Sequence, residues 1–197
     1  RFKLLGATNR DNYIGGYAES KNHISTVRDG KNGYASRDAS MYVNNMLELT
    51  GEYNKTYGKN FFTLLGGYSY NDYMGENFFM DNFDFPTDQF TYNNMGTGDA
   101  LKRGEAGMSS YKSSSKLIGF FGRLNYNFDE KYLLMLSVRQ EGSSKFGENN
   151  KWGTFPAVSA GWRISKESFF SAVPFIDDLK LRVGYGVTGT EPTSPYQ

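Results

Sequence analysis

The chain has 197 residues, of which 22 are basic, 21 are acidic and none is cysteine. Its near-neutral charge provides no basic surface for nucleic acid, and the lack of cysteine excludes disulfides and thiolate metal sites. Aromatic residues make up 17% of the chain although its mean hydropathy is -0.61, and no apolar run is long enough for a transmembrane helix.

The N-terminal half contains three predicted strands, each marked by alternation of apolar and polar residues. The first is a short strand over residues 2–7. The second has Val43, Leu47, Leu49 and Tyr53 on one face and Asn44, Glu48, Thr50 and Glu52 on the other. The third has Phe62, Leu64, Tyr68 and Tyr70 opposite Thr63, Ser69 and Asn71. Residues 10–40 and 74–115 are predicted to be long loops, and residues 54–60 a short link.

The C-terminal half contains four stronger strand patterns. Two alternating runs, 118–128 and 132–138, flank the polar link 129–131 and predict an antiparallel hairpin. Two further runs alternate over residues 156–165 and 179–188. Residues 142–155 are predicted to be a long loop, and residues 165–178 a link of medium length.

The predicted strands are apolar and uncharged on one face, and that face often ends in an aromatic residue. The opposite face carries isolated charges at Glu48, Arg123, Arg139, Arg163 and Arg182. A barrel wall between lipid and a wet lumen has this pattern, and short turns that alternate with long loops are typical of outer-membrane barrels. We therefore expect an all-β antiparallel meander of six or seven strands that forms part of a large transmembrane β-barrel, with long outer loops and short periplasmic turns.

The alternative is a soluble or surface β-sheet module whose aromatic loops bind glycans. Its solvent face would also be charged, so single strands do not separate the two hypotheses. Because single-chain bacterial barrels have at least about eight strands, and because open edges are costly in lipid, six or seven strands predict a partial barrel from the interior of a longer protein.

Four blocks of sequence resemble the SusC/RagA family of TonB-linked outer-membrane importers. They begin at Phe121, Ser137, Trp152 and Leu179 and read FGRLNYNFDEKYLL, SVRQEGSSKFG, WGTFPAVSAGWRIS and LKLRVGYGVTG. They follow the order and spacing of the family, whereas the N-terminal half is similar mainly in its strand pattern. Gln140 and Glu141 depart from the family, which tends to have a basic residue followed by aspartate.

The resemblance implies a barrel of about 22 strands in the cell outer membrane, in contact with lipid. It also implies an N-terminal plug that links the barrel to the TonB complex, and a surface lipoprotein lid of the SusD type. Such a system imports oligosaccharides or peptides, and it is neither an enzyme nor dependent on a cofactor. Residues 1–197 would then be a partial TonB-dependent receptor barrel without the plug.

No catalytic, cofactor or metal site is predicted. His23 lies in a polar loop without a nucleophile motif, and the spacing of Asp81, Asp84 and Asp88 is not that of a calcium-binding EF-hand. Candidates for contact with cargo or lid are Tyr92, Tyr111, Phe146 and Trp152. For Trp152 we favour the alternative that it anchors its loop on the strands. The lumen-facing arginines are expected to pair with Glu48, Glu52 and Glu141, or to contact the plug or the cargo.

Overall fold

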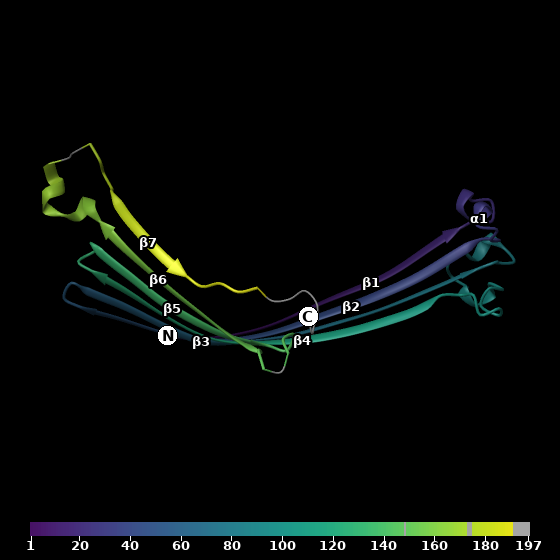
Figure 1. Ribbon diagram of the computed structural model, residues 1–197, viewed down its shortest axis with the longest axis horizontal. Helices are drawn as coiled ribbons and strands as arrows, with labels where there is room; N and C mark the ends of the chain where they lie inside the picture. The colour runs from purple at the N-terminus through teal and green to yellow at the C-terminus, as the bar shows by residue number, and fades with distance from the viewer. Residues whose placement is uncertain (148, 173–174, 191–197) are drawn as a thin grey trace. The chain divides into compact units, whose positions relative to one another are not determined.

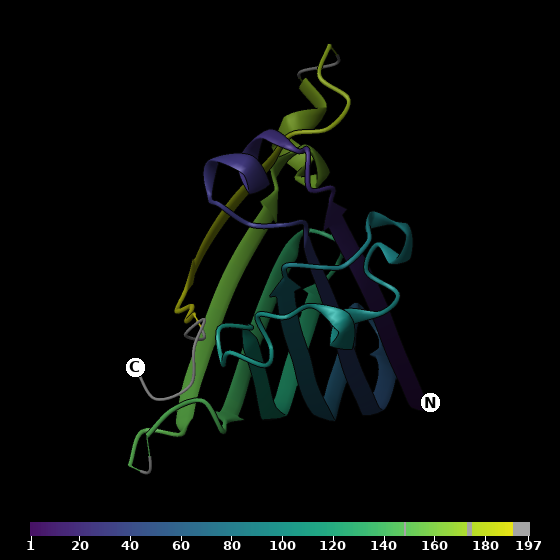
Figure 2. The ribbon, with the colours of Figure 1, turned by 90° about the vertical axis from the view of Figure 1, so that its right-hand side faces the viewer.

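The computed structural model describes residues 1–147, 149–172 and 175–190. Seven strands form one antiparallel meander in which each strand pairs with the next along the chain, and Figures 1 and 2 show them in chain order. The strands are β1 (Phe2–Glu19), β2 (Tyr34–Tyr57), β3 (Asn60–Phe83), β4 (Met108–Phe128), β5 (Tyr132–Ser143), β6 (Trp152–Arg163) and β7 (Lys180–Gly186). The predicted all-β meander is confirmed, and the strand predicted over residues 2–7 is present and extends to Glu19.

The helical segments lie in the links between strands. They are α1 (Ile24–Arg28), η1 (Asp88–Phe90), η2 (Met95–Thr97), η3 (Ile164–Lys166) and η4 (Ser168–Ala172). Among the described residues, no helix has the length and apolar character needed to cross a membrane.

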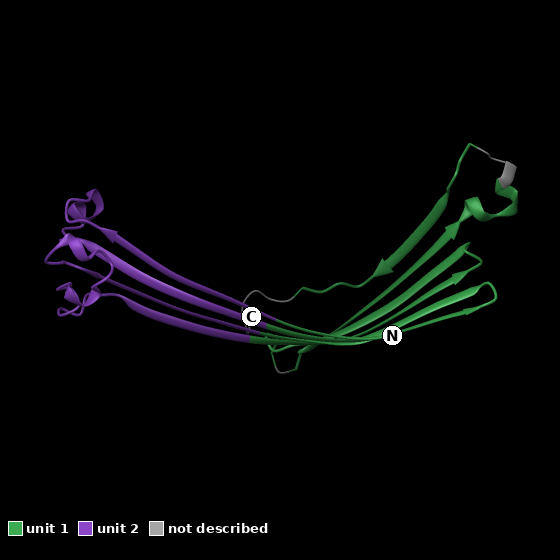
Figure 3. Cartoon of the chain, turned by 180° about the vertical axis from the view of Figure 1, so that it is seen from behind, with its two compact units in different colours: residues 1–7, 45–72, 115–197 green, residues 8–44, 73–114 purple. Residues whose placement is uncertain are grey.

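The chain divides into two compact units, which Figure 3 distinguishes by colour. Unit 1 comprises residues 1–7, 45–72 and 115–197, and unit 2 comprises residues 8–44 and 73–114. Strands β1 to β4 contribute residues to both units, whereas β5, β6 and β7 belong to unit 1 alone.

Parts of the two longest predicted loops are strands in the structure. Residues 10–40 and 74–115 were expected to be loops, but β2 and β3 each have 24 residues, and the links shrink to residues 20–33 and 84–107. The physical reason is that apolar and polar residues do not alternate regularly here: Ser109 to Ser115 of β4 is polar on both faces, and Phe78, Phe79 and Met80 of β3 are consecutive. Such strands have no apolar alternation, so hydrophobic periodicity does not detect them.

The short links are tight turns. Gly58, Asp129 and Glu130 adopt left-handed backbone conformations with φ of 55°, 54° and 56°, which suits tight hairpin turns. The Lys59 ammonium lies 2.9 Å from the Asp129 carboxylate, and the Asp129 N–H donates to the Lys59 carbonyl at 2.8 Å. These contacts join the two neighbouring turns of unit 1.

The register of unit 1 aligns the apolar residues on one face. Leu136 pairs with Leu124 on one side and with Val158 on the other, and Ala160 pairs with Val183. Because directly paired residues of antiparallel strands point to the same side, these residues form one continuous apolar face. The alternation predicted for β4 to β7 is therefore confirmed across strands as well as along them.

This apolar face is not covered by other parts of the described chain. In the described residues the buried apolar side chains are Ala35, Phe85, Ala100 and Phe170. Val138, in the interior of the sheet, remains 48% exposed. A soluble β-protein buries the apolar face of its sheet against a second layer, so this sheet requires an apolar environment of another kind.

Candidate functional site

Two rows of aromatic residues border the apolar face of unit 1. The row near the short turns includes Phe62, Tyr126, Phe128, Tyr132 and Trp162. Its Phe62 and Tyr126 rings lie 4.8 Å apart, and its Phe128 and Tyr132 rings 6.3 Å apart. We call it the turn-side row.

The second row, which we call the loop-side row, consists of Tyr68, Phe120 and Trp152. The ring of Phe120 lies 5.3 Å from that of Tyr68 and 6.3 Å from that of Trp152. Phe120 and Tyr126 are six positions apart on β4, a distance of about 20 Å along a strand. This is close to the ~25 Å apolar band, with aromatic borders, of an outer-membrane barrel.

Residues between the two rows are uncharged on this face. They include Leu64, Leu124, Leu134, Leu136, Val138, Val158, Ala160, Leu181 and Val183. An uncharged band between two aromatic rows matches the hydrocarbon core of a membrane with an interface on either side.

Glu167 holds the polar ends of the turn-side row. Its carboxylate accepts hydrogen bonds from the Tyr132 hydroxyl at 2.6 Å, the Lys131 ammonium at 3.1 Å and the Trp162 indole N–H at 3.2 Å. The Tyr132 hydrogen bond is the largest of the effects that lower the pKa of the Glu167 carboxyl, and the Lys131 hydrogen bond follows. Rings with an apolar body and a bonded polar tip suit a membrane interface.

The predicted lumen charges lie on the opposite face, and they differ in their partners. Arg139 donates to Glu141 and, at 3.3 Å, to the Ser69 hydroxyl, and its guanidinium lies 5.4 Å from the centre of the Phe121 ring. The predicted Arg139–Glu141 pair is therefore present. Arg163 instead lies 3.5 Å from Asp178.

The register places the other two arginines among small residues. Arg123 is opposite Ser137, and Arg182 is opposite Gly161. Glu48 lies in β2 and is partly exposed. The five charges are thus spread along the sheet and do not converge on one centre.

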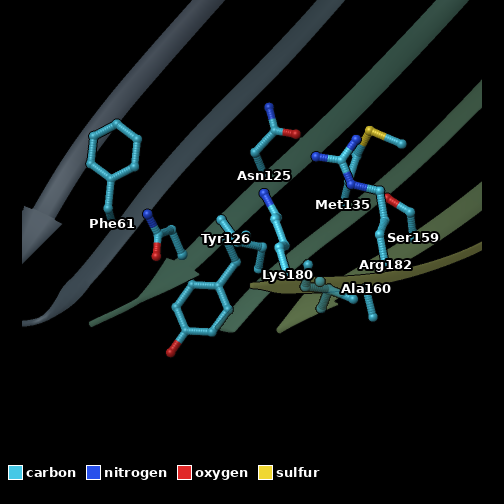
Figure 4. Close-up of a pocket in the computed structure, with 12 residues that line it drawn as sticks. Phe61, Asn125, Tyr126, Met135, Ser159, Ala160, Lys180 and Arg182 are labelled. Atoms are coloured by element: carbon cyan, nitrogen blue, oxygen red, sulfur yellow. The ribbon is translucent and has the colours of Figure 1, made fainter. Parts of the chain in front are cut away.

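A hollow of about 430 Å³ lies on this charged face, lined in part by Lys180 and Arg182 of β7, and Figure 4 shows its lining residues. Asn125 and Ser159 point to the same side as these two cations, whereas Tyr126 and Ala160 point to the other side. The side-chain oxygen of Asn127, another lining residue, is buried without a hydrogen-bond partner. The hollow combines apolar and polar lining residues with the two cations Lys180 and Arg182.

Phe146 and Trp152 lie close together at the link 144–151. Both line a small pocket of about 150 Å³, together with Leu117 and Phe155. Trp152 is the first residue of β6, and its ring stacks on Phe120 in the loop-side row. Contact with lid or cargo stays a prediction for both residues, and the position of Trp152 favours the alternative that it anchors its loop.

Tyr92 and Tyr111 belong to unit 2 and have different surroundings. The Tyr92 ring packs on Gly16, where a Cβ would lie 2.6 Å from a ring carbon, and the Arg37 guanidinium lies 5.7 Å from the ring centre. Tyr111 was expected in the longest loop, but it lies in β4 and is exposed. Their predicted roles are untested.

The link 84–107 is an ordered structure built on Asn82. The Asn82 amide donates to the carbonyls of Met95 at 2.7 Å and Gly98 at 3.0 Å, and its oxygen accepts from the Leu101 N–H at 3.1 Å. The Asn32 N–H, which donates to Asp84, is the largest of the effects that lower the pKa of the Asp84 carboxyl, and Arg103 adds to it.

The remaining candidate groups have structural partners. Asp81 accepts from the Tyr34 hydroxyl at 3.2 Å and from the Gly107 N–H at 2.6 Å. His23 Nδ1 lies 3.5 Å from the Glu19 carboxylate. In the part of the chain that the structure describes, no group of three or more His, Cys, Asp or Glu side chains could hold a metal ion.

The family model for the TonB dependent receptor-like β-barrel matches residues 3–196. The chain belongs to this family. Among curated proteins it is similar to TonB-dependent receptor P3 of Formosa agariphila, with 34% identity over 85% of this chain and 16% of that protein. It is also similar to TonB-dependent receptor SusC of Bacteroides thetaiotaomicron, with 43% identity over 42% of this chain and 8% of that protein.

Solved structures of a peptide transporter show the same fold as this TonB-dependent receptor barrel. The RagAB peptide transporter matches with a TM-score of 0.82 and 25% identity over 94% of this chain and 20% of that chain. The RagAB importer in its closed-closed state matches with a TM-score of 0.85 and 25% identity over 99% of this chain and 21% of that chain. This chain therefore spans about a fifth or less of its relatives' length.

The predicted SusC/RagA-like barrel in the outer membrane is thus confirmed. The apolar face of unit 1, between its aromatic rows, is the surface that a TonB-dependent receptor barrel presents to lipid. Its relatives are receptors and not enzymes. This family and location argue against the alternative of a soluble glycan-binding module.

Proposed function

We propose that residues 1–197 form part of the wall of an outer-membrane importer that takes up oligosaccharides or peptides. The plug, the TonB contact and a SusD-like lipoprotein lid would come from other parts of the system. The observation that supports a wall most directly is the two-sided sheet of unit 1. One side is uncharged between two aromatic rows, and the other carries Arg123, Arg139, Arg163 and Arg182.

The relatives support import as the task of this wall. A similar curated protein is a TonB-dependent receptor named SusC, and the similar solved structures are of a peptide transporter. A wet, charged lumen face permits polar cargo to pass, because charged side chains there remain hydrated. We propose that the cationic hollow near Lys180 and Arg182 contacts the plug or the passing cargo.

The import proposal is tested by deleting the gene for the full-length receptor and measuring uptake of labelled oligosaccharides and peptides. We expect uptake of one cargo class to fall to the level of a strain without TonB, and to return when the gene is restored. We also expect a surface lipoprotein to copurify with the receptor. Uptake that depends neither on the receptor nor on TonB would contradict the proposal.

A further inference from the structure

The apolar face of unit 1 has a hollow at a position where its sheet carries a small residue. Ala160 pairs with Leu134 of β5 on one side and with Val183 of β7 on the other. Because directly paired residues point to the same side, the Ala160 methyl group lies between two larger side chains. Figure 4 shows Ala160 on the side of the sheet away from Lys180 and Arg182. The hollow is therefore on the lipid face.

Larger residues also border Ala160 along β6. Its neighbours on the same face are Val158 and Trp162, two positions away in either direction. The register aligns Trp162 with Tyr132 and Leu181, so a row of bulky side chains closes the hollow toward the short turns. The hollow has a volume of about 340 Å³, and its lining includes Tyr126, Tyr132, Leu134, Ala160, Trp162, Leu181 and Val183. These side chains are uncharged, so the hollow suits an apolar occupant.

The polar atoms of the lining rings already have partners. The Tyr132 hydroxyl and the Trp162 indole N–H donate to Glu167, and the Tyr126 hydroxyl donates to the Asn60 side chain at 2.7 Å. Water would therefore gain little by entering the hollow, whereas an empty hollow would forfeit van der Waals contacts. The hollow is continuous with the apolar band that faces lipid, so an acyl chain is the group available to fill it.

The charges beside the turn-side end of the hollow are balanced. Three ion pairs join the turns to each other and to the link after β6, at 2.9, 3.1 and 3.1 Å: Lys59 with Asp129, Lys131 with Glu167, and Lys166 with Glu130. Lys131 also lies 3.9 Å from Asp129. Because cations and anions are equal in number, no excess positive charge attracts an anionic lipid. A zwitterionic head group, with one phosphate and one ammonium, complements such paired charges.

Phe169 extends the aromatic wall at the same end. Its ring lies 6.5 Å from the ring of Trp162 in an edge-on arrangement, and it remains 61% exposed. Phe169 belongs to η4, which Figure 1 shows in yellow-green beyond the end of β6. An exposed ring that packs on Trp162 beyond the strand suits the boundary between acyl chains and head groups.

We propose that this hollow is a binding site for a zwitterionic phospholipid, of the phosphatidylethanolamine type. One acyl chain lies over Ala160, between Leu134 and Val183, and fills the hollow in the wall. The head group lies at the turn-side end, next to the Lys131–Glu167 pair. The site is on the face opposite the cationic hollow near Lys180 and Arg182, and it does not depend on the cargo of the importer.

The test uses native mass spectrometry of the full-length receptor, stripped of lipid in detergent, which counts bound lipid molecules. The probes are phosphatidylethanolamine and phosphatidylglycerol with identical acyl chains. The test variant is Ala160→Phe, whose ring occupies the hollow. The matched control is Val158→Phe, which adds the same ring on the same face of β6 at a residue that is 41% exposed and outside the lining.

We expect the native receptor to bind its first phosphatidylethanolamine more tightly than phosphatidylglycerol. Ala160→Phe should bind it about tenfold more weakly, the effect of losing about ten van der Waals contacts between carbon atoms. Val158→Phe should bind it normally. If Ala160→Phe does not fold, Leu181→Ala provides a second comparison, because it removes one wall of the hollow and should also weaken binding.

A charge substitution tests the head-group position separately. Glu167→Gln removes one anion and leaves the turn-side end with a net positive charge, so phosphatidylglycerol should gain affinity relative to phosphatidylethanolamine. A merely structural role of Glu167 would weaken both lipids alike.

Equal binding by Ala160→Phe and Val158→Phe would overturn the inference, and so would unchanged binding in both Ala160→Phe and Leu181→Ala. Tighter binding of phosphatidylglycerol by the native receptor, or no retained lipid at all, would contradict it as well. An unchanged lipid preference in Glu167→Gln would show that the head group does not lie beside the Lys131–Glu167 pair.

Discussion

At the residue scale, Glu167 illustrates how one partly buried carboxylate organises a membrane interface. Its three donors come from the turn 129–131, from β5 and from β6. The Tyr132 and Trp162 side chains it bonds belong to the turn-side aromatic row. The carboxylate therefore fixes the polar tips of rings whose apolar bodies remain in contact with lipid.

We expect Glu167→Ala to lower the midpoint of thermal unfolding of the full-length receptor in detergent. Tyr132→Phe, which removes only the hydroxyl, should lower the midpoint in the native background and have little effect beside Glu167→Ala. The temperature at which gel mobility changes on heating measures the unfolding midpoint of each variant and of the double variant. Additive effects of the two substitutions would contradict the proposed hydrogen-bond coupling.

The lowered pKa of Glu167 adds a pH dependence to this effect. A carboxyl with a lowered folded-state pKa stabilises the fold above its unfolded-state pKa, and this stabilisation is lost as the pH falls through the folded-state value. The difference between the native protein and Tyr132→Phe should thus be full at neutral pH and should shrink in acid.

At the element scale, the strands of unit 1 assign neighbouring residues to opposite environments. Leu136 pairs with Leu124 and Val158 on the apolar face, about midway between the aromatic rows. Ser137 pairs with Arg123 and Ala157 on the charged face. The neighbouring residues Leu136 and Ser137 therefore face lipid and the lumen, respectively.

Leu136→Arg should destabilise the full-length receptor in bilayers by about 2–4 kcal/mol, the cost of arginine on the lipid face near the midplane. Ser137→Arg introduces the same side chain on the wet face, where repulsion from Arg123 should have only a small effect. Urea unfolding in phospholipid vesicles compares the two. Equal losses of stability would show that the faces are wrongly assigned.

Strands are predicted best from the sequence where contact with lipid requires apolar and polar residues to alternate. In β4 to β7 every second residue must be apolar, so hairpins, faces and turns could be predicted from residues such as Leu124, Leu136 and Val158. In unit 2 apolar and polar residues do not alternate regularly, so parts of the 24-residue strands were predicted to be loops.

Contacts distant in sequence could not be predicted from the residues alone. The ion pair of Arg163 with Asp178 depends on the path of the link 164–179, and the stacking of Trp152 on Phe120 depends on strand register. Glu48, Arg123 and Arg182 could be assigned to a face but not to a partner. Alternation determines which side a residue occupies, while the register determines what it contacts.

At the scale of the whole molecule, the sheet is open. Strands β1 and β7 each pair with one neighbour in the described chain. Unpaired strand edges cost several kcal/mol per group in lipid, so we expect both edges to pair with further strands in the membrane. This agrees with relatives of which the chain spans 16% and 8%. The wall then separates lipid from a lumen that carries the arginines.

The most direct test of this account is the environment of single cysteines in the full-length receptor, freed of any other cysteine and reconstituted in vesicles. Cysteines at Leu136, Val138 and Val158 should carry a fluorophore that brominated lipids quench. Cysteines at Ser137 and Ser159 should escape quenching by lipid and react with water-soluble maleimide. Quenching of both sets alike, or of the serine positions alone, would contradict the assignment of lipid and lumen faces.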